Sequence, residues 1–442
     1  MTPAEPTETH LGVFRSLRGF NYRIWAVGAL ISNVGTWMQR TAQDWLVLTQ
    51  LTDHNATAVG TVMALQFGPQ VLMLPFSGSA ADHLDRRKLV FATQAAMGAL
   101  ALGLGLLTVT GLVRLWHVYL FAFLLGCVSA FDSPARQAFV SELVTEPDLP
   151  NAVGLNSTSF NGARMIGPAV AGVLIARIGT GWVFLLNAAS FVAMLGALRL
   201  LRTAELHLRP RAPRKPGSFV EGFRYAWRRP DLMVILVMLF FVGTFGLNFP
   251  IYLSTMSVSV FHKGASEYGF LTSILAVGTV VGAFFAATRA KPGVGVLVAG
   301  SLAFGVGLAL AAVMPSYGLF ALPLVLVGVA AQTITTTANS TLQLSTEPAM
   351  RGRVVALFLA IAVGGTPVGA PIVGWVADRF GPRWGLGVGA AGGFAAALVG
   401  LRYLLTHRRP PLLFQAARVE PGLGDDGPAT PEDGARATLR GA

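Results

Sequence analysis

Charged side chains are scarce in this sequence. Only 12% of its 442 residues are Asp, Glu, Lys or Arg, whereas 53% are apolar. Soluble domains carry roughly twice that charged fraction. This scarcity excludes a string of ordinary soluble domains, because they could not be given polar surfaces, and it indicates a polytopic membrane protein.

Cysteine is nearly absent as well, since Cys127 is the single one and lies in an apolar run. A disulfide framework and a clustered cysteine metal site are therefore excluded. The sequence has no phosphate-binding glycine loop ending in Lys-Ser/Thr, and its seven histidines show no metal-ligand spacing. No nucleophile-and-base arrangement is evident. We expect no enzyme activity, no metal and no cofactor, and an ion gradient rather than ATP as the energy source.

Long apolar runs dominate the chain, and no cleavable signal precedes the first. About 20 apolar residues are needed to cross a ~30 Å hydrocarbon core. Such runs predict an all-α polytopic membrane protein with 12 transmembrane helices in two six-helix halves. The predicted spans are 22–51, 56–81, 89–112, 116–138, 152–175, 182–200, 232–261, 268–287, 294–314, 319–344, 354–377 and 384–405.

The formal net charge of +12 follows the predicted topology. With both termini in the cytoplasm, 26 of the 33 Lys and Arg residues fall in inside segments, five in outside loops and two, Arg40 and Arg164, within spans. This is the positive-inside pattern. It places the positive charge against an anionic inner leaflet, so nucleic-acid binding is not needed to explain it.

Polar segments divide the chain into five parts. We predict a cytoplasmic, interfacial N-terminal segment over 1–21, a six-helix half over 22–200, a cytoplasmic loop over 201–231, a second half over 232–405 and a disordered tail over 406–442. Within the loop, Phe219, Phe223 and Trp227 recur at helical spacing and predict an amphipathic surface helix.

The two predicted halves contain an internal repeat. The stretch GPAVAGVLIARIGTGW (167–182) aligns with GAPIVGWVADRFGPRW (369–384) at an offset of 202. Small or special residues coincide, including Gly172 with Gly374 and Gly179 with Gly381. Parallel repeats of this kind are typical of secondary transporters that bind their substrate at the midplane between two halves.

The most specific motif follows the second predicted span and reads GSAADHLDRRK (78–88). With six spans on each side of a central loop, it resembles the major facilitator superfamily. Within that superfamily the chain is similar to the exporter group that includes the enterobactin exporter and drug-efflux relatives. GTWMQRTAQDWLVL, FDSPARQAFVSELV and GARMIGPAVAG also fit this group. The resemblance covers about 12–405 and implies a secondary transporter that works by alternating access.

In the superfamily this loop contributes to a latch that holds the cytosolic side closed. The candidate latch residues are Gly78, Asp82, Asp85, Arg86, Arg87, Asp132 and Arg136. Gly78 allows close helix approach, and Asp82 can face the positive N-terminus of the eleventh span. We expect Arg86 to reach Asp132 in the fourth span. The alternatives are a local Asp132–Arg136 pair, and a loop whose basic residues only set topology. Asp85 departs from the superfamily, which usually has glycine there.

The fifth span carries GARMIGPAVAG, in which Gly162, Gly167, Pro168 and Gly172 give a small-residue surface. It resembles the antiporter motif of the superfamily. We expect close packing against the eighth span, with a generic packing helix as the alternative.

Costly polar residues inside spans indicate the transport site. Arg40 and Asp44, at i and i+4 of the first span, are the candidate proton-coupling pair, with a structural salt bridge as the alternative. Arg164 could attract an anionic substrate group or satisfy a helix-end carbonyl. The candidate cavity residues are Gln39, Gln43, Asn161, Arg164, Gln332, Thr336 and Asn339. The last three, with Gln343, form one stripe of the tenth span, which either packs on a helix or lines water.

These observations predict proton-coupled export of small amphipathic organic molecules: a drug, an antibiotic or a siderophore-like metabolite. The alternatives are an importer or uniporter of the same fold and a non-transporting receptor or scaffold. The expected partners are the substrate, protons and the lipid bilayer, with no nucleic acid, and we expect a monomer. Four lysines against 29 arginines fit a high-GC bacterium, and hence a bacterial cytoplasmic membrane.

Overall fold

The computed structural model describes residues 12–73, 76–77, 80, 84–207, 219–287 and 292–407. Every regular element among these residues is a helix. Helices satisfy their own backbone hydrogen bonds, which a chain crossing a bilayer requires.

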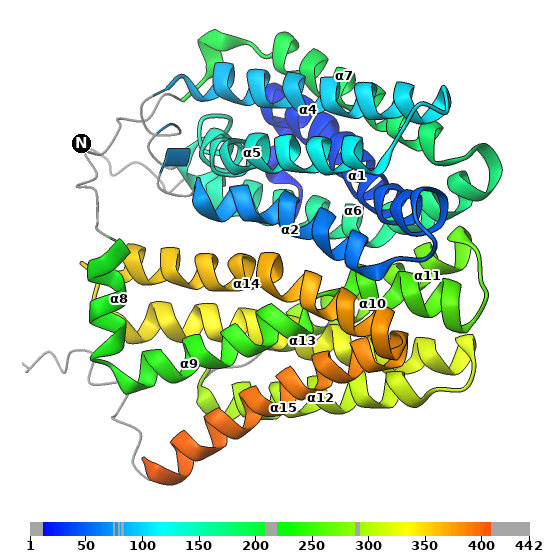
Figure 1. Ribbon diagram of the computed structural model, residues 1–442. Coiled ribbons are helices and arrows are strands. Elements are labelled where there is room, and N and C mark those ends of the chain that lie inside the picture. Colours follow the sequence, from blue (N-terminus) through cyan, green and yellow to red (C-terminus); the bar gives the residue numbers. More distant parts are fainter. Residues whose placement is uncertain are drawn as a thin grey trace, which may run out of the picture.

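The first half of the chain supplies one group of long helices, drawn from blue to green in Figure 1. They are α1 (Phe20–Leu46) with its π-helical continuation η2 (Val47–Leu51), α2 (Ala56–Leu72), α4 (Arg86–Val109), α5 (Leu115–Val140), α6 (Leu149–Ile178) and α7 (Thr180–Leu200). α1 packs on α6 and α7, and α4 packs on α5 and α7.

The second half supplies a matching group, drawn from green to orange. Its elements are α9 (Pro230–Phe241), η5 (Val242–Gly246), α10 (Phe249–Thr255), η6 (Met256–Val260), α11 (Ala265–Ala287), α12 (Val294–Val313), α13 (Tyr317–Ser345), α14 (Arg351–Phe380) and α15 (Pro382–Thr406). α12 packs on α13 and α15, and α11 packs on α13.

The two groups lie side by side, with α2 against α14 and α6 against α11 (Figure 1). The short helix α8 (Phe219–Trp227) lies at one end of the molecule, at the left of the view. We call this the α8 end and the other the opposite end. The first residues of α2 and α11 lie at the opposite end, where the two halves meet.

The internal repeat is confirmed by these contacts. Gly172 of α6 lies against the first residues of α11, where an added Cβ would come 2.6 Å from the carbonyl oxygen of Ala265. Gly374 of α14 lies against the start of α2 in the same way, 2.5 Å from the carbonyl oxygen of Ala56. Only glycine permits either approach. Both helices then end at the aligned residues Gly179 and Gly381, with φ of 87° and 104°.

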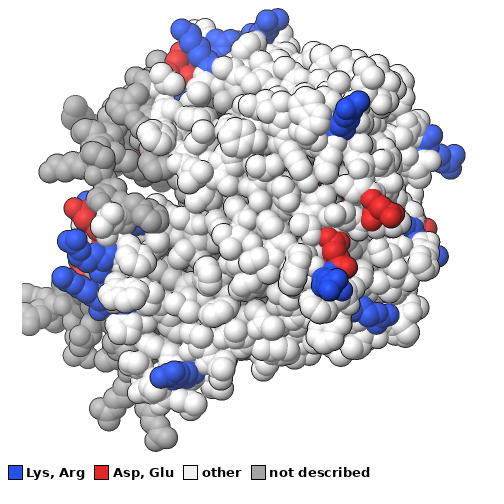
Figure 2. Space-filling view, viewed as in Figure 1, with Lys and Arg blue, Asp and Glu red and all other residues white. Residues whose placement is uncertain are grey.

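The surface shown in Figure 2 has an uncharged belt between two ends that carry the Lys, Arg, Asp and Glu residues. Large apolar side chains are exposed on many helices, such as Val192 (68%), Phe284 (71%) and Leu398 (67%). Such a belt fits hydrocarbon rather than water. Among the described residues, nine helices are long and apolar enough to cross a membrane. α1, α2 and α6 are not among them: α2 has 17 residues, and the other two contain polar stretches.

The span predicted over 232–261 is confirmed as a stretch long and apolar enough to cross a membrane, Pro230–Val260, but its helix is irregular. The helix opens at Leu247–Asn248, with π-helical turns on both sides. Two side chains take over carbonyls freed at the opening: Asn248 Nδ2 donates to Thr244 O at 2.7 Å, and the Tyr252 hydroxyl donates to Phe245 O. Membrane helices tolerate an irregularity when side chains satisfy the backbone in this way.

The predicted amphipathic helix is confirmed as α8. Phe223 and Trp227 are exposed, and Glu221 pairs with Arg353 of α14 at 3.1 Å. Near the N-terminus, Arg15 pairs with Asp148 at 3.0 Å and Ser16 bonds Asn151, which fastens this segment to the start of α6. The predicted tail lies outside the described residues from 408 onward.

Candidate functional site

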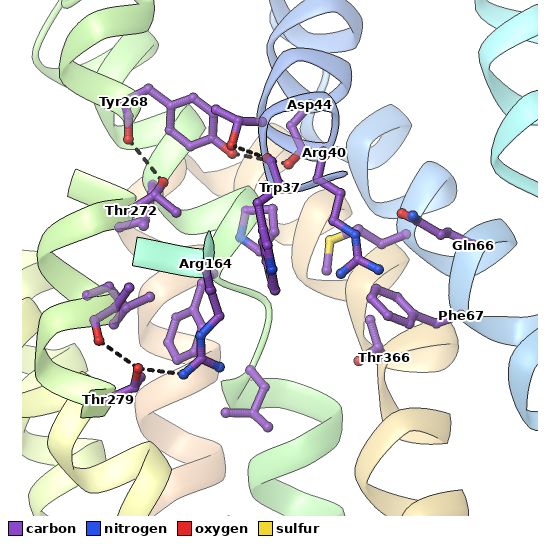
Figure 3. Close-up of a pocket in the computed structure, with 18 residues that line it drawn as sticks. Trp37, Arg40, Asp44, Gln66, Phe67, Arg164, Tyr268, Thr272, Thr279 and Thr366 are labelled. Atoms are coloured by element: carbon purple, nitrogen blue, oxygen red, sulfur yellow. Dashed lines mark hydrogen bonds between the residues drawn. The ribbon is translucent and has the colours of Figure 1, made fainter. Parts of the chain in front are cut away.

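A cavity of about 230 Å³ lies between the two halves (Figure 3). Both halves contribute to its walls: α1, α2 and α6 on one side, and α10, α11 and α14 with Leu247 on the other. The lining residues used below are Trp37, Arg40, Asp44, Gln66, Phe67, Arg164, Phe249, Tyr268, Thr279 and Thr366. A site shared by two halves can change its surroundings when the halves move.

Arg40 enters this cavity from α1. Its guanidinium carbon lies 5.0 Å from the centroid of the Trp37 ring and 5.7 Å from that of Phe67. Its Nε is buried without a hydrogen-bond partner. No ion pair between Arg40 and Asp44 occurs among the described residues, so the two are neighbours on one helix face but not a salt bridge.

Asp44, one turn further along α1, is only 8% exposed. The hydroxyl of Tyr268, from α11 in the other half, donates to its Oδ2 at 3.1 Å, as Figure 3 shows. Trp45 stacks on the same tyrosine ring, with centroids 6.1 Å apart. Asp44 therefore lies at the contact between the halves, on the side of the cavity nearer the opposite end.

Arg164 enters from α6. Its Nη2 donates to Thr279 Oγ1 of α11 at 2.6 Å, and its Nε is buried without a partner. Of its two predicted roles, the cavity-lining one agrees with this placement, because the bonded oxygen is a side chain rather than a helix-end carbonyl.

Arg40, Asp44 and Arg164 are the predicted residues that the structure brings together. The other candidates lie elsewhere. Gln39 accepts a hydrogen bond from Asn187 Nδ2 of α7 at 2.6 Å and is buried, as is Gln43. Asn161 bonds the Ser157 carbonyl of its own helix. None of these three side chains lines this cavity, and Gln39 joins α1 to α7 instead.

The predicted stripe of the tenth span also lies outside the cavity lining. Its members bond along α13: Gln332 Nε2 donates to Thr336 Oγ1, and Gln343 Nε2 donates to Asn339 Oδ1, each at 2.9 Å. The stripe thus satisfies its own polar groups. Gln332, Thr336 and Asn339 do not line this cavity, and their part in a substrate site stays a prediction.

Sequence reasoning missed Gln66, Tyr268 and Thr279. A signal was present for two of them, because Tyr268, Thr272 and Thr279 fall at i, i+4 and i+11 and form a polar stripe along α11. Gln66 is 5% exposed, and its Nε2 has no hydrogen-bond partner. It is a lone amide in an apolar helix, which gives no periodic signal.

The predicted latch is only partly described, since Gly78 and Asp82 lie outside the described residues. Asp85 caps the N-terminus of α4 by accepting from Lys88 N at 3.0 Å. Arg87 donates to the carbonyl of Leu198 at the end of α7, at 2.9 and 3.2 Å. Both residues fasten the α8 end of the first half.

The prediction that Arg86 reaches Asp132 is wrong. Arg86 pairs with Glu142 at 2.8 Å. Glu142 follows Asp132 by ten residues and lies in the turn after α5, nearer the start of α4. Asp132 accepts instead from Thr93 and Gln94 of α4, at 2.7 and 2.8 Å.

The local alternative for Asp132 is confirmed. Its Oδ2 lies 3.8 Å from Arg136 Nη1 on the next turn of α5. Arg136 also donates to Asn33 Oδ1 of α1 at 3.1 Å and lies 5.8 Å from the Trp25 ring centroid. The pair therefore joins α5 to α4 and α1 within one half.

The small-residue surface of α6 packs on two helices. Gly167 meets α1, where an added Cβ would come 2.7 Å from Trp37 Cβ, and Gly172 meets the start of α11. The carbonyl of Pro168 lies against Gly269 of α11, while nothing lies near Gly162. Packing against the eighth span is therefore confirmed for Pro168 and Gly172, and Gly162 takes no part.

A contact that the sequence did not reveal joins the two halves at the opposite end. The carboxylate of Asp378, on α14, accepts from Ala56 N at 2.7 Å and from Thr57 N at 2.8 Å, and it also bonds the Thr57 hydroxyl at 2.5 Å. It thereby caps the N-terminus of α2 from the other half of the molecule, where the helix dipole favours negative charge.

Two helical halves, an uncharged belt and a charged cavity between the halves define a polytopic membrane transporter. The chain belongs to the transmembrane secretion effector family of the major facilitator superfamily, whose family model matches residues 12–412. It is therefore a membrane transporter and not an enzyme, as the sequence predicted.

Two curated relatives illustrate the family. An enterobactin exporter of Shigella flexneri is 27% identical over 364 residues, covering 81% of this chain and 85% of the relative. A staphyloferrin A transporter of Staphylococcus aureus is 25% identical over 357 residues, covering 79% and 87%.

Solved structures share the fold. A bacterial homologue of the human lysosomal transporter Spinster, inward-facing and occupied, superposes with a TM-score of 0.70 at 16% identity, covering 90% of this chain and 99% of that one. A POT family transporter in complex with a thioalcohol-conjugated peptide gives 0.70 at 14% identity, with the same coverages. At such identities the likeness concerns the fold alone.

Proposed function

We propose that this protein is a secondary transporter that exports a small organic molecule by alternating access. The observation that carries the proposal is the cavity between the halves, whose ionisable residues come from one half and whose Tyr268 and Thr279 come from the other. If the halves rock about this cavity, those inter-half bonds break and reform, and the cavity faces each side of the membrane in turn.

Export is favoured over import by the family description, secretion effector, and by the exporter name of the Shigella relative. The two relatives are named for enterobactin and staphyloferrin A. A siderophore-like metabolite is accordingly our first substrate class, followed by an antibiotic or another amphipathic drug.

Protons are the proposed driving ion, and Asp44 is the proposed carrier. The groups that act on it are Tyr268 on α11 and Arg40 on its own helix, while Arg164 lies further along the cavity. A carboxylate that loses its negative charge on protonation changes its bond to Tyr268 and its attraction to Arg40. Proton binding is thereby linked to the inter-half contact.

The proposed arrangement has twelve crossings, with α1, α2 and α6 joining the nine apolar helices, and both termini in the cytoplasm. The α8 end is then cytoplasmic, and the halves 22–200 and 232–405 are the moving bodies. The basic residues near α8 face an anionic inner leaflet. The membrane is the bacterial cytoplasmic membrane, the transporter acts as a monomer, and it uses a proton gradient and no cofactor.

A comparison of a deletion strain with its complemented form tests the function. We expect one or a few small organic metabolites to move from the medium into the cells when the protein is lost, and to return to the medium on complementation. Metabolite profiling of medium and cells is the measurement. Identical profiles and identical drug susceptibilities would contradict export and favour a receptor or scaffold.

A further inference from the structure

The cavity holds polar donors that the protein itself does not use. Among the described residues Arg40 makes no hydrogen bond or ion pair, and Arg164 makes one bond, to neutral Thr279. Three residues of the lining have a buried polar side-chain atom without a partner: Arg40 Nε, Arg164 Nε and Gln66 Nε2. All three atoms are N–H donors. An unpaired donor buried in a membrane protein is costly, so a ligand acceptor would stabilise it.

The charges of the lining also favour a ligand that carries an acceptor, in particular an anion. The groups of the lining that can carry a charge include two guanidiniums and one carboxylate, Asp44, which already accepts from Tyr268. Positive charge is therefore in excess, and more so when Asp44 is protonated. Low-dielectric walls strengthen the attraction of a bound anion.

The rest of the lining is mostly apolar and includes several aromatic side chains. Trp37 and Phe67 lie under Arg40, and Phe249 lies on the other half. In Figure 3 the indole of Trp37 lies between the side chains of Arg40 and Arg164. A planar ligand body can stack on such rings, while its acidic group reaches the guanidiniums, whose forked donors suit a carboxylate.

We propose that Arg40 and Arg164 form a paired anion site and that the substrate is an organic acid: a planar or apolar body carrying a carboxylate or a comparably acidic group. This proposal rests on the proposed function for its physiological meaning. It adds the charge of the substrate and the residues that recognise it.

Binding of three matched probes tests it: naphthalene-2-carboxylate, naphthalene-2-carboxamide and 2-naphthylmethylamine, which share one ring system and differ in charge. The full-length protein is reconstituted in lipid nanodiscs without any gradient, and affinities are measured by calorimetry. The acid binds most tightly and the amine least. Because a hydrogen bond to a charged group is strong, Arg40→Gln and Arg164→Gln each weaken acid binding by about tenfold or more. Neither variant alters carboxamide binding.

Each variant has a matched control on its own helix. Arg23 of α1 and Arg177 of α6 are exposed and lie outside the cavity, so Arg23→Gln and Arg177→Gln make the same charge change and leave all three affinities unchanged. Arg40→Lys, which keeps the charge without the fork, recovers part of the acid affinity.

Three results would each overturn the anion site. The first is that the acid does not bind, and the second is that it binds no more tightly than the carboxamide. The third is that the Gln variants lose affinity for the acid and the carboxamide equally. The result is separable from the transport proposal. If the protein prefers the acid but the deletion strain and its complemented form have the same metabolite profiles, the anion site stands and the transport function is contradicted. If the protein exports a metabolite but shows no preference for the acid, the transport function stands and the anion site is contradicted.

Discussion

Ionisable side chains inside a membrane protein are costly, and here each one in the cavity has a distinct environment. Arg40 lies on aromatic rings, Arg164 bonds Thr279, and Asp44 accepts from Tyr268. The Asp44–Tyr268 bond also joins the two halves. We therefore expect this bond to hold the halves together near the opposite end, and its loss should favour opening at that end.

Tyr268→Phe removes this bond and keeps the ring that stacks on Trp45. A hydrogen bond to a carboxylate is worth about 1.5–3 kcal/mol, so the ratio of open to closed opposite ends should rise about tenfold or more. The measurement is a distance distribution between spin labels at exposed Leu112 and Lys263, which lie on different halves, in a Cys127→Ser background.

Tyr317→Phe is the matched control, because Tyr317 donates to the Glu267 carbonyl within the second half alone. Its label distances should equal those of the parent. An unchanged distribution in Tyr268→Phe would contradict the role of the Asp44–Tyr268 bond.

At this scale the sequence predicted the charged residues and misplaced most neutral ones. Arg40, Asp44 and Arg164 could be predicted because a charged side chain within an apolar span is costly and is kept there only when it has a partner or a function. Gln39 and Gln43 precede Arg40 and Asp44 by one residue each, a rotation of about 100° on a helix. They therefore face α7 instead of the cavity. Which face of a helix meets the cavity depends on tertiary packing, which hydropathy does not report.

At the scale of helices, the repeat gives two equivalent contacts between the halves, with one difference. Gly172 and Gly374 each admit the start of a helix from the other half. Only the α14–α2 contact carries a carboxylate, since Asp378 aligns with Ala176 in the repeat. Asp378 holds the N-terminus of α2 through two backbone N–H groups and a hydroxyl.

Asp378→Ala should release this inter-half cap. A capping side chain contributes about 1 kcal/mol and the helix dipole about 0.3–1 kcal/mol more, which predicts a shift of about tenfold to thirtyfold toward an open opposite end. The Leu112–Lys263 label pair measures it. Asp53→Ala, which removes an exposed carboxylate from the same end, should leave the distances unchanged. If the distances between the labels at Leu112 and Lys263 are the same in Asp378→Ala as in Asp53→Ala, Asp378 does not hold the halves together.

The helices themselves could be predicted well from hydropathy, because each must bury its backbone in an apolar environment. The opening at Leu247–Asn248 could not, because the run stays apolar across it and the bonds that support it come from Asn248 and Tyr252. The partner of Arg86 was missed for a similar reason. Glu142, in the turn after α5, and Asp132, inside α5, are both possible partners for Arg86, and only the three-dimensional structure shows that Arg86 pairs with Glu142.

For the whole molecule, the function that we propose is a single cycle. In this proposed cycle substrate enters the cavity from the α8 end, Asp44 takes a proton from the other side, and the contacts of Tyr268 and Asp378 break and reform as the halves rock. Because proton entry drives substrate exit, acidifying the outside should speed export. The same cycle run in inverted vesicles should load substrate when the lumen is acidic.

The most direct test of this central claim is substrate uptake into inverted vesicles under an imposed pH gradient, with the metabolite identified by the strain comparison. Wild-type protein and Asp53→Asn should accumulate the substrate when the lumen is acidic, and an ionophore should abolish the accumulation. Asp44→Asn, expressed at the same level, should show no response to the gradient. Ionophore-insensitive accumulation, or a full response by Asp44→Asn, would contradict proton coupling through Asp44.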